Sequence, residues 1–145
     1  MSKLDCLATL IAGACHDYRH DGFTNLWHKN KDTERYKSFG AEGTQEKFHF
    51  AESWKVLTES DECNFIKHLC YEDQARFKLR MLGCIHATDM GRHVSDLAAM
   101  KEMLADLKVT SEKEPIVDLT LPADKLVGQQ QKWLEHVSHF SDVSF

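Results

Sequence analysis

Apolar residues recur every three or four positions along most of this chain, which is the period of an α-helix with one buried face. The first run predicts a helix over 4–17 whose apolar stripe consists of Leu4, Leu7, Ala8, Ile11 and Ala14/Cys15. Gly22, Thr24 and Asn25 interrupt this pattern, and a short helix is predicted over 26–36. The chain therefore opens with two helices separated by a turn.

The later part of the chain keeps the helical period. Gly40 and Gly43 mark a loop, after which Thr44 is predicted to cap a helix. The side chains predicted to be buried on the central helices are Phe50, Trp54, Leu57, Phe77, Met81 and Ile85. Further helices are predicted over 60–69, 72–88, 94–104 and 122–139. The polar segment 108–122 carries both prolines and is predicted to be an internal loop. This pattern predicts an all-α fold, a compact helical bundle that forms one domain over 1–145.

Composition excludes several classes of partner. A chain of 145 residues can bury the core of one domain. Its net charge of -5 offers no electrostatic footprint for nucleic acid. The apolar stretch at 7–14 is too short to span a membrane and lacks the basic flank of a signal peptide. Five cysteines without a C-x-x-C pair are typical of reduced thiols, so we expect a cytoplasmic protein with no membrane span.

Residues that bind divalent metals cluster at three places on the predicted helices. His16 and Asp17 end the first run, and His20 lies three positions after Asp17. Glu46 and His49 are spaced i, i+3 and therefore share one helix face. A third set near the end of the sequence comprises His136, His139 and Asp142. Because carboxylates and imidazoles that converge from several helices form the metal sites of helical bundles, these residues are candidate ligands.

Four motifs occur in an order that resembles the class I cyclic-nucleotide phosphodiesterases, which are helical enzymes that hydrolyse cAMP or cGMP. The first begins at His16 and reads H-D-x-x-H-x-G-x-x-N. The others are E-x-x-H at Glu46, A-T-D-M-x-x-H at Ala87 and H-x-x-D-V-S at His139. Four ordered matches are far more specific than any one of them. The chain is therefore similar to part of a phosphodiesterase catalytic domain of the HD type over about 7–144.

The resemblance implies a role for each residue of these motifs. His16, Asp17 and Asp142 would be metal ligands, with Asp17 bridging to a second ion. The residues implied to hold the waters of that second ion are His20, Glu46, His49 and Thr88. Asn25 would support the adjoining loop, and Met90 would line the substrate pocket. The family implies two divalent ions, one zinc-like and one magnesium- or manganese-like, whose shared hydroxide attacks the phosphorus of a 3',5'-cyclic nucleotide and yields the 5'-monophosphate.

Two parts of the family pattern have no counterpart in the printed sequence. In the family, a further His ligand and the His that protonates the leaving oxygen belong to an H-N-x-x-H element before the His-Asp pair. The general-acid His is therefore expected upstream of Met1, and no catalytic general acid is expected within the chain. The purine-binding Gln and Phe of the family follow the last Asp. The chain is expected to be a fragment of a catalytic domain, truncated at both ends.

The residues leave two other functions open. A non-catalytic helical remnant or interaction module could keep part of the metal site without the upstream His element. A different HD-type nucleotide phosphohydrolase would also use a His-Asp pair, although the A-T-D-M and H-x-x-D-V-S motifs argue against it. A domain truncated at both ends is also expected to leave apolar faces exposed, such as the stripe at 4–14, and exposed patches of this kind promote self-association. The remaining histidines are expected on the surface or in ordinary hydrogen bonds: His28, His68, His86, His93 and His136.

Overall fold

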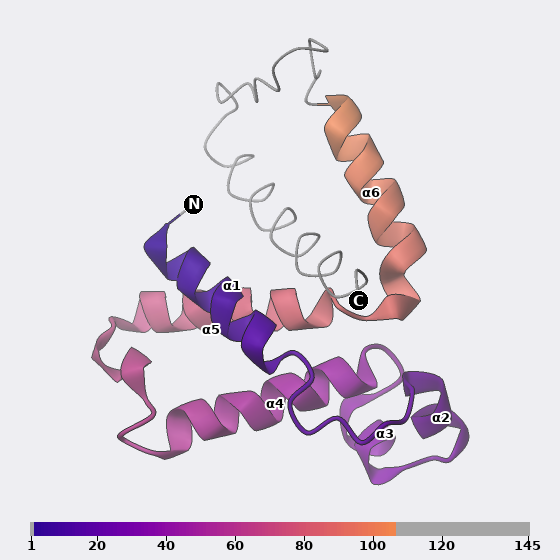
Figure 1. Ribbon diagram of the computed structural model, residues 1–145, viewed down its shortest axis with the longest axis horizontal. Helices are drawn as coiled ribbons and strands as arrows, with labels where there is room; N and C mark the ends of the chain where they lie inside the picture. The colour runs from indigo at the N-terminus through magenta and orange to yellow at the C-terminus, as the bar shows by residue number, and fades with distance from the viewer. Residues whose placement is uncertain (1, 107–145) are drawn as a thin grey trace.

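The computed structural model describes residues 2–106, with side chains through residue 102. Within this part every regular element is a helix, which confirms the all-α prediction (Figure 1). The helices are α1 (Lys3–Cys15), α2 (Asn25–Asn30), α3 (Glu34–Phe39), α4 (Thr44–Glu59), η1 (Phe65–His68), α5 (Tyr71–His86), η2 (Met90–Arg92) and α6 (His93–Asp106).

Several of the predictions fall outside the described residues. They are the loop at 108–122, the helix at 122–139 and the candidate site residues His139 and Asp142. Met1 also lies outside them, and the prediction that the general-acid His belongs upstream of Met1 concerns residues beyond the printed sequence. These points stay predictions.

The core lies between α1, α4 and α5. Helices α4 and α5 run in opposite directions and are joined through η1, and α1 packs chiefly against α5 (Figure 1). Ala8 and Ala12 are buried in this contact. Their small side chains let the two helices approach closely. The predicted inward side chains Phe77, Met81 and Ile85 are fully buried in the same cluster. This packing brings the C-terminal ends of α1 and α5 to the N-terminal end of α4.

The apolar stripe of α4 completes the core, as its period predicts. Leu57 is buried in the cluster, and the half-buried Phe50 and Trp54 pack against it. The rings of Phe50 and Trp54 are stacked, with centroids 5.9 Å apart. The five cysteines, all in the described part, are free thiols. No helix among the described residues is long and apolar enough to cross a membrane.

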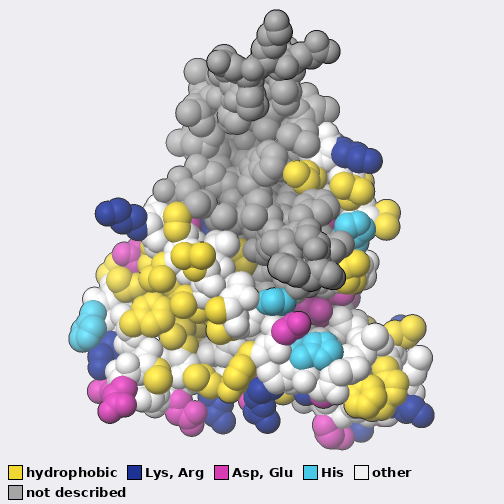
Figure 2. All heavy atoms as spheres, in the orientation of Figure 1, with side chains coloured by type: hydrophobic (Ala, Val, Ile, Leu, Met, Phe, Trp, Pro, Cys, Tyr) yellow, Lys and Arg dark blue, Asp and Glu magenta, His cyan; other side chains and the backbone are white. Residues whose placement is uncertain are grey.

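Helix α5 covers much of the stripe that the sequence predicts to be exposed on α1. Besides the two buried alanines, Leu4 and Ile11 pack against the core. The expectation that the whole stripe at 4–14 is uncovered is therefore wrong, because it ignored the partner helix. Leu10, at 72% exposure, and Leu7, at 39%, remain accessible. Figure 2 shows hydrophobic side chains gathered over the region of α1 and α5. Self-association through such side chains stays a prediction.

The segment 26–36 forms two short helices rather than the single predicted one. The backbone leaves the helical conformation at Asp32, whose φ is 48°. The hydroxyl of Thr33 then accepts a hydrogen bond from the Tyr36 amide at 3.2 Å and caps α3. A threonine followed by Glu34 is a helix-start signal, and it prevails over the apolar period of the segment.

The start of α4 also differs from the prediction. Thr44 is the first residue of the helix rather than its cap, and its hydroxyl donates to the Gly40 carbonyl. The cap is Gly43, which adopts a left-handed conformation with φ of 59°. Glycine suits this position because it has no Cβ to collide with the following carbonyl. A Cβ here would also lie 2.6 Å from His86 Nε2 of α5, so the glycine allows α4 and α5 to meet.

We expect Gly43→Ala to lower the free energy of unfolding by at least about 1–2 kcal/mol, the cost of a left-handed non-glycine residue. The contact with His86 adds to this cost. Gly13→Ala is the matched control, because Gly13 lies within α1 and no described atom comes within 4 Å of a Cβ there. That control should stabilise the chain by about 0.5–1 kcal/mol. Urea denaturation measures both values, and equal effects of the two substitutions would contradict this account.

Candidate metal centre

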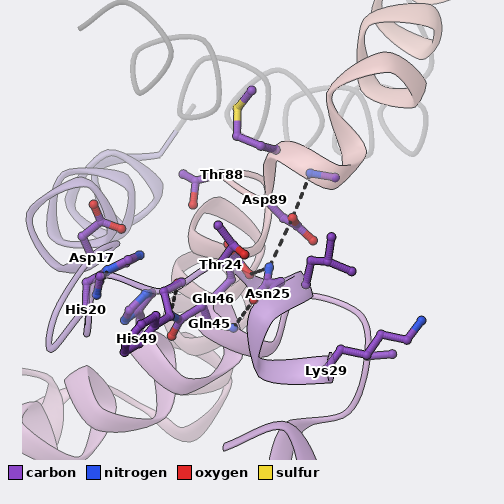
Figure 3. A pocket seen from close by; sticks show the side chains of 16 residues that line it. Asp17, His20, Thr24, Asn25, Lys29, Gln45, Glu46, His49, Thr88 and Asp89 are labelled. Atoms are coloured by element: carbon purple, nitrogen blue, oxygen red, sulfur yellow. Dashed lines mark hydrogen bonds between the residues drawn. The ribbon is translucent and has the colours of Figure 1, made fainter. Parts of the chain in front are cut away.

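The turn that follows α1 presents the residues of the first motif. The Tyr18 amide donates to the Cys15 carbonyl at 2.9 Å, and the His20 amide donates to the Asp17 carbonyl at 3.0 Å. Between them, Arg19 has a φ of 62°, and its guanidinium pairs with Glu52 of α4. This tight turn brings the side chains of Asp17 and His20 together (Figure 3), and it directs the Tyr18 carbonyl toward His49 of α4.

Asp17, His20 and His49 form a cluster that can hold a metal ion. One ligand atom from each residue lies within 4.8 Å of the other two. The imidazole rings of His20 and His49 are stacked with centroids 5.5 Å apart. Asp17 and His20 come from the turn after α1, whereas His49 comes from the first turns of α4 (Figure 3). Two of the predicted motifs therefore meet in space.

The hydrogen bonds of His49 fix the chemical form of its ring. Nδ1 lies 2.7 Å from the Tyr18 carbonyl oxygen, which can only accept, so Nδ1 carries the proton. Nε2 is buried and has no hydrogen-bond partner within the described part of the chain. Burial lowers the pKa of His49, and the hydrogen bond to Tyr18 and the charge of Asp17 only partly oppose this. The ring therefore presents an unprotonated Nε2 toward its neighbours, which is the form that binds a cation.

The imidazole of His20 carries its proton on the other ring nitrogen. The Gly22 amide donates to its Nδ1 at 2.9 Å, and a backbone amide can only donate. In the neutral ring the proton is then on Nε2, which makes this atom a hydrogen-bond donor. In this form the ring can hold a water or a phosphate oxygen beside a cation that is bound by Asp17 and His49 of the same cluster. The motif implies a water-holding role for His20, and this role stays a prediction.

His16 lies beside Asp17 rather than within the cluster. Its Nδ1 is 2.8 Å from the Gly13 carbonyl oxygen, so this nitrogen carries the proton. Its Nε2 lies 3.7 Å from Asp17 Oδ2. The nitrogen with the lone pair therefore faces the carboxylate, as a cation shared by His16 and Asp17 would require.

Glu46 and Asp89 extend the acidic side of the site. Asn25 Nδ2 donates to Glu46 Oε2 at 2.9 Å and to Asp89 Oδ1 at 3.4 Å. Burial raises the pKa of Glu46, and the charges of Asp89 and Asp17 raise it further, while the Asn25 hydrogen bond opposes them. Because neighbouring carboxylates repel one another when they are charged, such a group favours the binding of a cation.

These side chains line one pocket of about 650 Å³ (Figure 3). All the predicted site residues that the structure describes line it, except His16. Thr88 belongs to the pocket wall, and its hydroxyl donates to the Ile85 carbonyl at 2.8 Å. Met90 is 57% exposed and lines the pocket, and its role as a substrate contact stays a prediction. On the surface, acidic and histidine side chains lie side by side near the middle of the face in Figure 2.

Several residues of this pocket are absent from the sequence prediction. Asp89 follows Thr88 inside the A-T-D-M motif, so the motif itself contained the signal. Phe23 and Leu26 add exposed apolar surface, and Gln45 is buried beneath the site. Nothing in the local pattern separates these residues from their neighbours, because the pocket that unites them forms only in the fold.

The donor atoms in this pocket are of the kinds that bind divalent cations. It contains a buried imidazole Nε2 with a lone pair and several carboxylates within one pocket. Imidazole nitrogen and carboxylate oxygen are the donors that zinc, manganese and magnesium accept in proteins. A buried unpartnered nitrogen costs free energy unless something binds it. The residues present therefore fit a divalent cation.

Comparisons with known proteins identify relatives of this chain. The chain is 34% identical over 143 residues to the probable 3',5'-cyclic-AMP phosphodiesterase pde-4 of Caenorhabditis elegans, and the match covers 99% of this chain and 20% of that protein. It is 27% identical to the dual specificity calcium/calmodulin-dependent 3',5'-cyclic nucleotide phosphodiesterase 1 of Drosophila melanogaster, over 94% of this chain and 16% of that protein. The chain thus spans about a fifth of the length of these relatives.

The fold matches solved structures as well. The crystal structure of the phosphodiesterase domain of the RhoPDE fusion protein from Salpingoeca rosetta superposes with a TM-score of 0.81 at 24% identity. The match covers 99% of this chain and 41% of that domain. The model of the 3'5'-cyclic nucleotide phosphodiesterase family matches residues 1–145. Because this match covers the whole sequence, the chain belongs to the 3',5'-cyclic nucleotide phosphodiesterase family.

Proposed function

We propose that this chain carries metal-binding residues of an enzyme that hydrolyses a 3',5'-cyclic nucleotide, cAMP or cGMP, to the 5'-monophosphate. The observation that carries the proposal is the unprotonated, buried Nε2 of His49 beside the side chains of Asp17 and His20. The proposed ligands of a zinc-like ion are His16, Asp17 and Asp142. A second, magnesium- or manganese-like ion would share Asp17. Family membership supports this assignment of residues.

Divalent cations supply such a site with a nucleophile at neutral pH and with charge that stabilises the phosphoryl transition state. The side chains around them have separate tasks. His20 Nε2–H would donate a hydrogen bond to an oxygen of the substrate or of water. His49 Nε2 would accept one or bind a cation. Asn25 keeps Glu46 in position through the hydrogen bond from its Nδ2. The proton for the leaving oxygen is assigned to none of these residues but to the His expected upstream of Met1.

The two sides of the pocket suit the two halves of a cyclic nucleotide. Asp17, His20 and His49 form the polar side, where cations would neutralise the phosphodiester. Met90 and Leu26, at 57% and 64% exposure, contribute apolar surface to the same pocket. A ligand with an anionic group and an apolar ring can contact both sides. The preference between cAMP and cGMP is not assigned by these residues.

Calorimetric titration with Mn²⁺ and Mg²⁺, together with an assay of cAMP and cGMP hydrolysis, tests the proposal. We expect micromolar binding of Mn²⁺ by this chain. In the longest natural product that contains it, a chelator should lower hydrolysis by about 100-fold or more, which corresponds to the loss of several kcal/mol of transition-state stabilisation. No detectable cation binding, with no hydrolysis, would instead favour the non-catalytic interaction module. A cytoplasmic location stays a prediction, supported by the free thiols.

A further inference from the structure

Gln45 is a buried polar residue directly beneath the pocket. Only 3% of its surface is exposed, although glutamine is normally a surface residue. Its Nε2 donates to Asp21 Oδ1 at 2.9 Å and to the Phe23 carbonyl at 2.7 Å, and its Oε1 accepts from Arg35. A buried amide is tolerated only when its polar atoms are bonded, and here they are. These bonds join α4 to α3 and to the loop that carries His20.

The backbone of Gln45 makes a second connection, to the first residue of α2, which directly follows the same loop. The Gln45 amide belongs to the first turn of α4, where amides have no partner inside the helix. Gly43 has no side chain to cap them, and Asn25 Oδ1 instead accepts from the Gln45 amide at 2.8 Å. The same Asn25 side chain donates to Glu46. The start of α2, where the loop ends, and the start of α4 therefore depend on each other.

Asp21 links Gln45 to the part of the loop that carries His20. Its carboxylate accepts from Gln45, from Arg35 at 3.1 Å, from His28 at 3.2 Å and from the Phe23 amide at 3.2 Å. His28 is buried and also contacts Thr33 at 2.9 Å, so the carboxylate is held from α2, α3 and α4 together. The guanidinium of Arg35 is in turn stacked over the Phe48 ring at 3.7 Å.

Gly22 orients the imidazole of His20. It lies between Asp21 and Phe23, both of which accept a hydrogen bond from Gln45, and its φ is 83°. In this conformation its amide donates to His20 Nδ1. Fixing Asp21 and Phe23 therefore fixes the bond that leaves the proton of His20 on Nε2. Polar networks of this kind specify a single geometry when every member is bonded.

We propose that Gln45, acting through Asp21, is a positioning residue that holds His20 and Asn25 in register with Asp17, Glu46 and His49. The effect on cation binding rests on the function proposed above, whereas the effect on the loop does not. Residues that orient metal ligands from behind change metal affinity by about 10–100-fold when they are replaced. Gln45 is thus expected to affect cation binding without contact with the cation.

Gln45→Met tests the proposal because methionine preserves the length of the side chain and removes its hydrogen bonds. We expect the Mn²⁺ dissociation constant, measured by calorimetry on the folded variant, to rise about tenfold. Hydrogen exchange of the Gly22 and Phe23 amides should accelerate as well. Gln74→Met is the matched control, since within the described part of the chain Gln74 Nε2 donates to the Leu69 carbonyl just before α5, away from the pocket. Neither quantity should change in that control.

Unchanged Mn²⁺ affinity and unchanged exchange in folded Gln45→Met would overturn the proposal. If the parent chain binds no Mn²⁺, the proposed function fails, and the exchange of the two amides alone decides the positioning role. If Gln45→Met does not fold, Asp21→Asn takes its place. That variant keeps an oxygen for Phe23 and Gln45 but loses the charge that binds Arg35. It should show smaller changes in the same direction, and their absence would count against the proposal.

Discussion

In the longest natural product that contains this chain, replacing Asp17 with asparagine is expected to abolish cyclic-nucleotide hydrolysis and to leave the helical fold intact. The side chain of Asp17 is 65% exposed, so its charge is not needed by the core. It is the carboxylate of the candidate metal cluster, and the structure places His16, His20 and His49 around it. Asparagine keeps the shape of the side chain and removes the negative charge. A loss of about a thousandfold or more corresponds to about 4 kcal/mol of transition-state stabilisation.

The measurement combines hydrolysis, Mn²⁺ calorimetry and circular dichroism. Asp61→Asn is the matched control, because this aspartate is 92% exposed and pairs only with Lys67 across a surface turn, among the contacts described. The control should bind Mn²⁺ and hydrolyse substrate like the parent protein. Undiminished hydrolysis by Asp17→Asn would refute the assignment of Asp17 as a metal ligand. Lost hydrolysis together with a lost helical signal would show a folding defect instead.

Helical periodicity predicted most of the described fold because the core follows it. Phe77, Met81 and Ile85 repeat at four-residue steps on α5, and all three are fully buried. The same rule places Glu46 and His49 on one face of α4, and both line the pocket. Local spacing within a helix is therefore sufficient to predict which of its side chains share a site.

The remaining features depend on contacts between segments that are distant in sequence. Gln45 and His28 are buried because Asp21 and Arg35, from other elements, satisfy their polar atoms. No periodic pattern identifies such partners. The left-handed conformation of Gly43 also depends on a distant segment, because His86 of α5 lies close beside it. The prediction that Thr44 caps α4 used only the local sequence and could not include this contact.

The site itself is built from the ends of helices rather than from one element. Asp17 follows α1, His49 lies near the start of α4, and Thr88 follows α5. Its geometry therefore depends on how α1 packs against α5, since this contact sets the distance between two of its walls. Thr9 of α1 lies 3.8 Å from Cys84 of α5, close to the middle of the contact. At the other end of this contact, near the start of α1, a cluster of charged side chains holds α1 and α5 together.

Asp5 is the centre of that cluster. It is 1% exposed, and its carboxylate accepts from Arg76 at 2.6 and 3.1 Å and from Arg80 Nε at 3.3 Å. It also accepts from the amide and hydroxyl of Ser2, which caps α1. Burial on its own raises the pKa of Asp5, but the hydrogen bonds from Ser2, then that from Arg76 and the charge of Arg80, outweigh it and lower the pKa to about 2.

We expect Asp5→Ala to lower the free energy of unfolding by about 3–5 kcal/mol, which is typical of breaking a buried ion pair. The loss is large because the side chain of Arg80 is 6% exposed and would keep an uncompensated charge. Another of its guanidinium nitrogens, Nη1, already has no hydrogen-bond partner within the described residues. Natural domains are stable by only about 5–15 kcal/mol, so much of the stability would be lost. Urea denaturation at neutral pH measures the change.

The pH dependence of unfolding separates the charge of Asp5 from its packing. Because the folded pKa is about 2 and the ordinary value 3.8, the stabilisation is complete above about pH 4 and is lost as pH falls through 2. That shift is worth about 2 kcal/mol. Asp5→Asn should lack this part of the acid-induced loss. The double variant Asp5→Asn with Arg80→Met should recover stability relative to Asp5→Asn, because it removes the buried unpaired charge. An acid profile of Asp5→Asn identical to that of the parent chain would show that Asp5 does not fasten α1 to α5 through its charge.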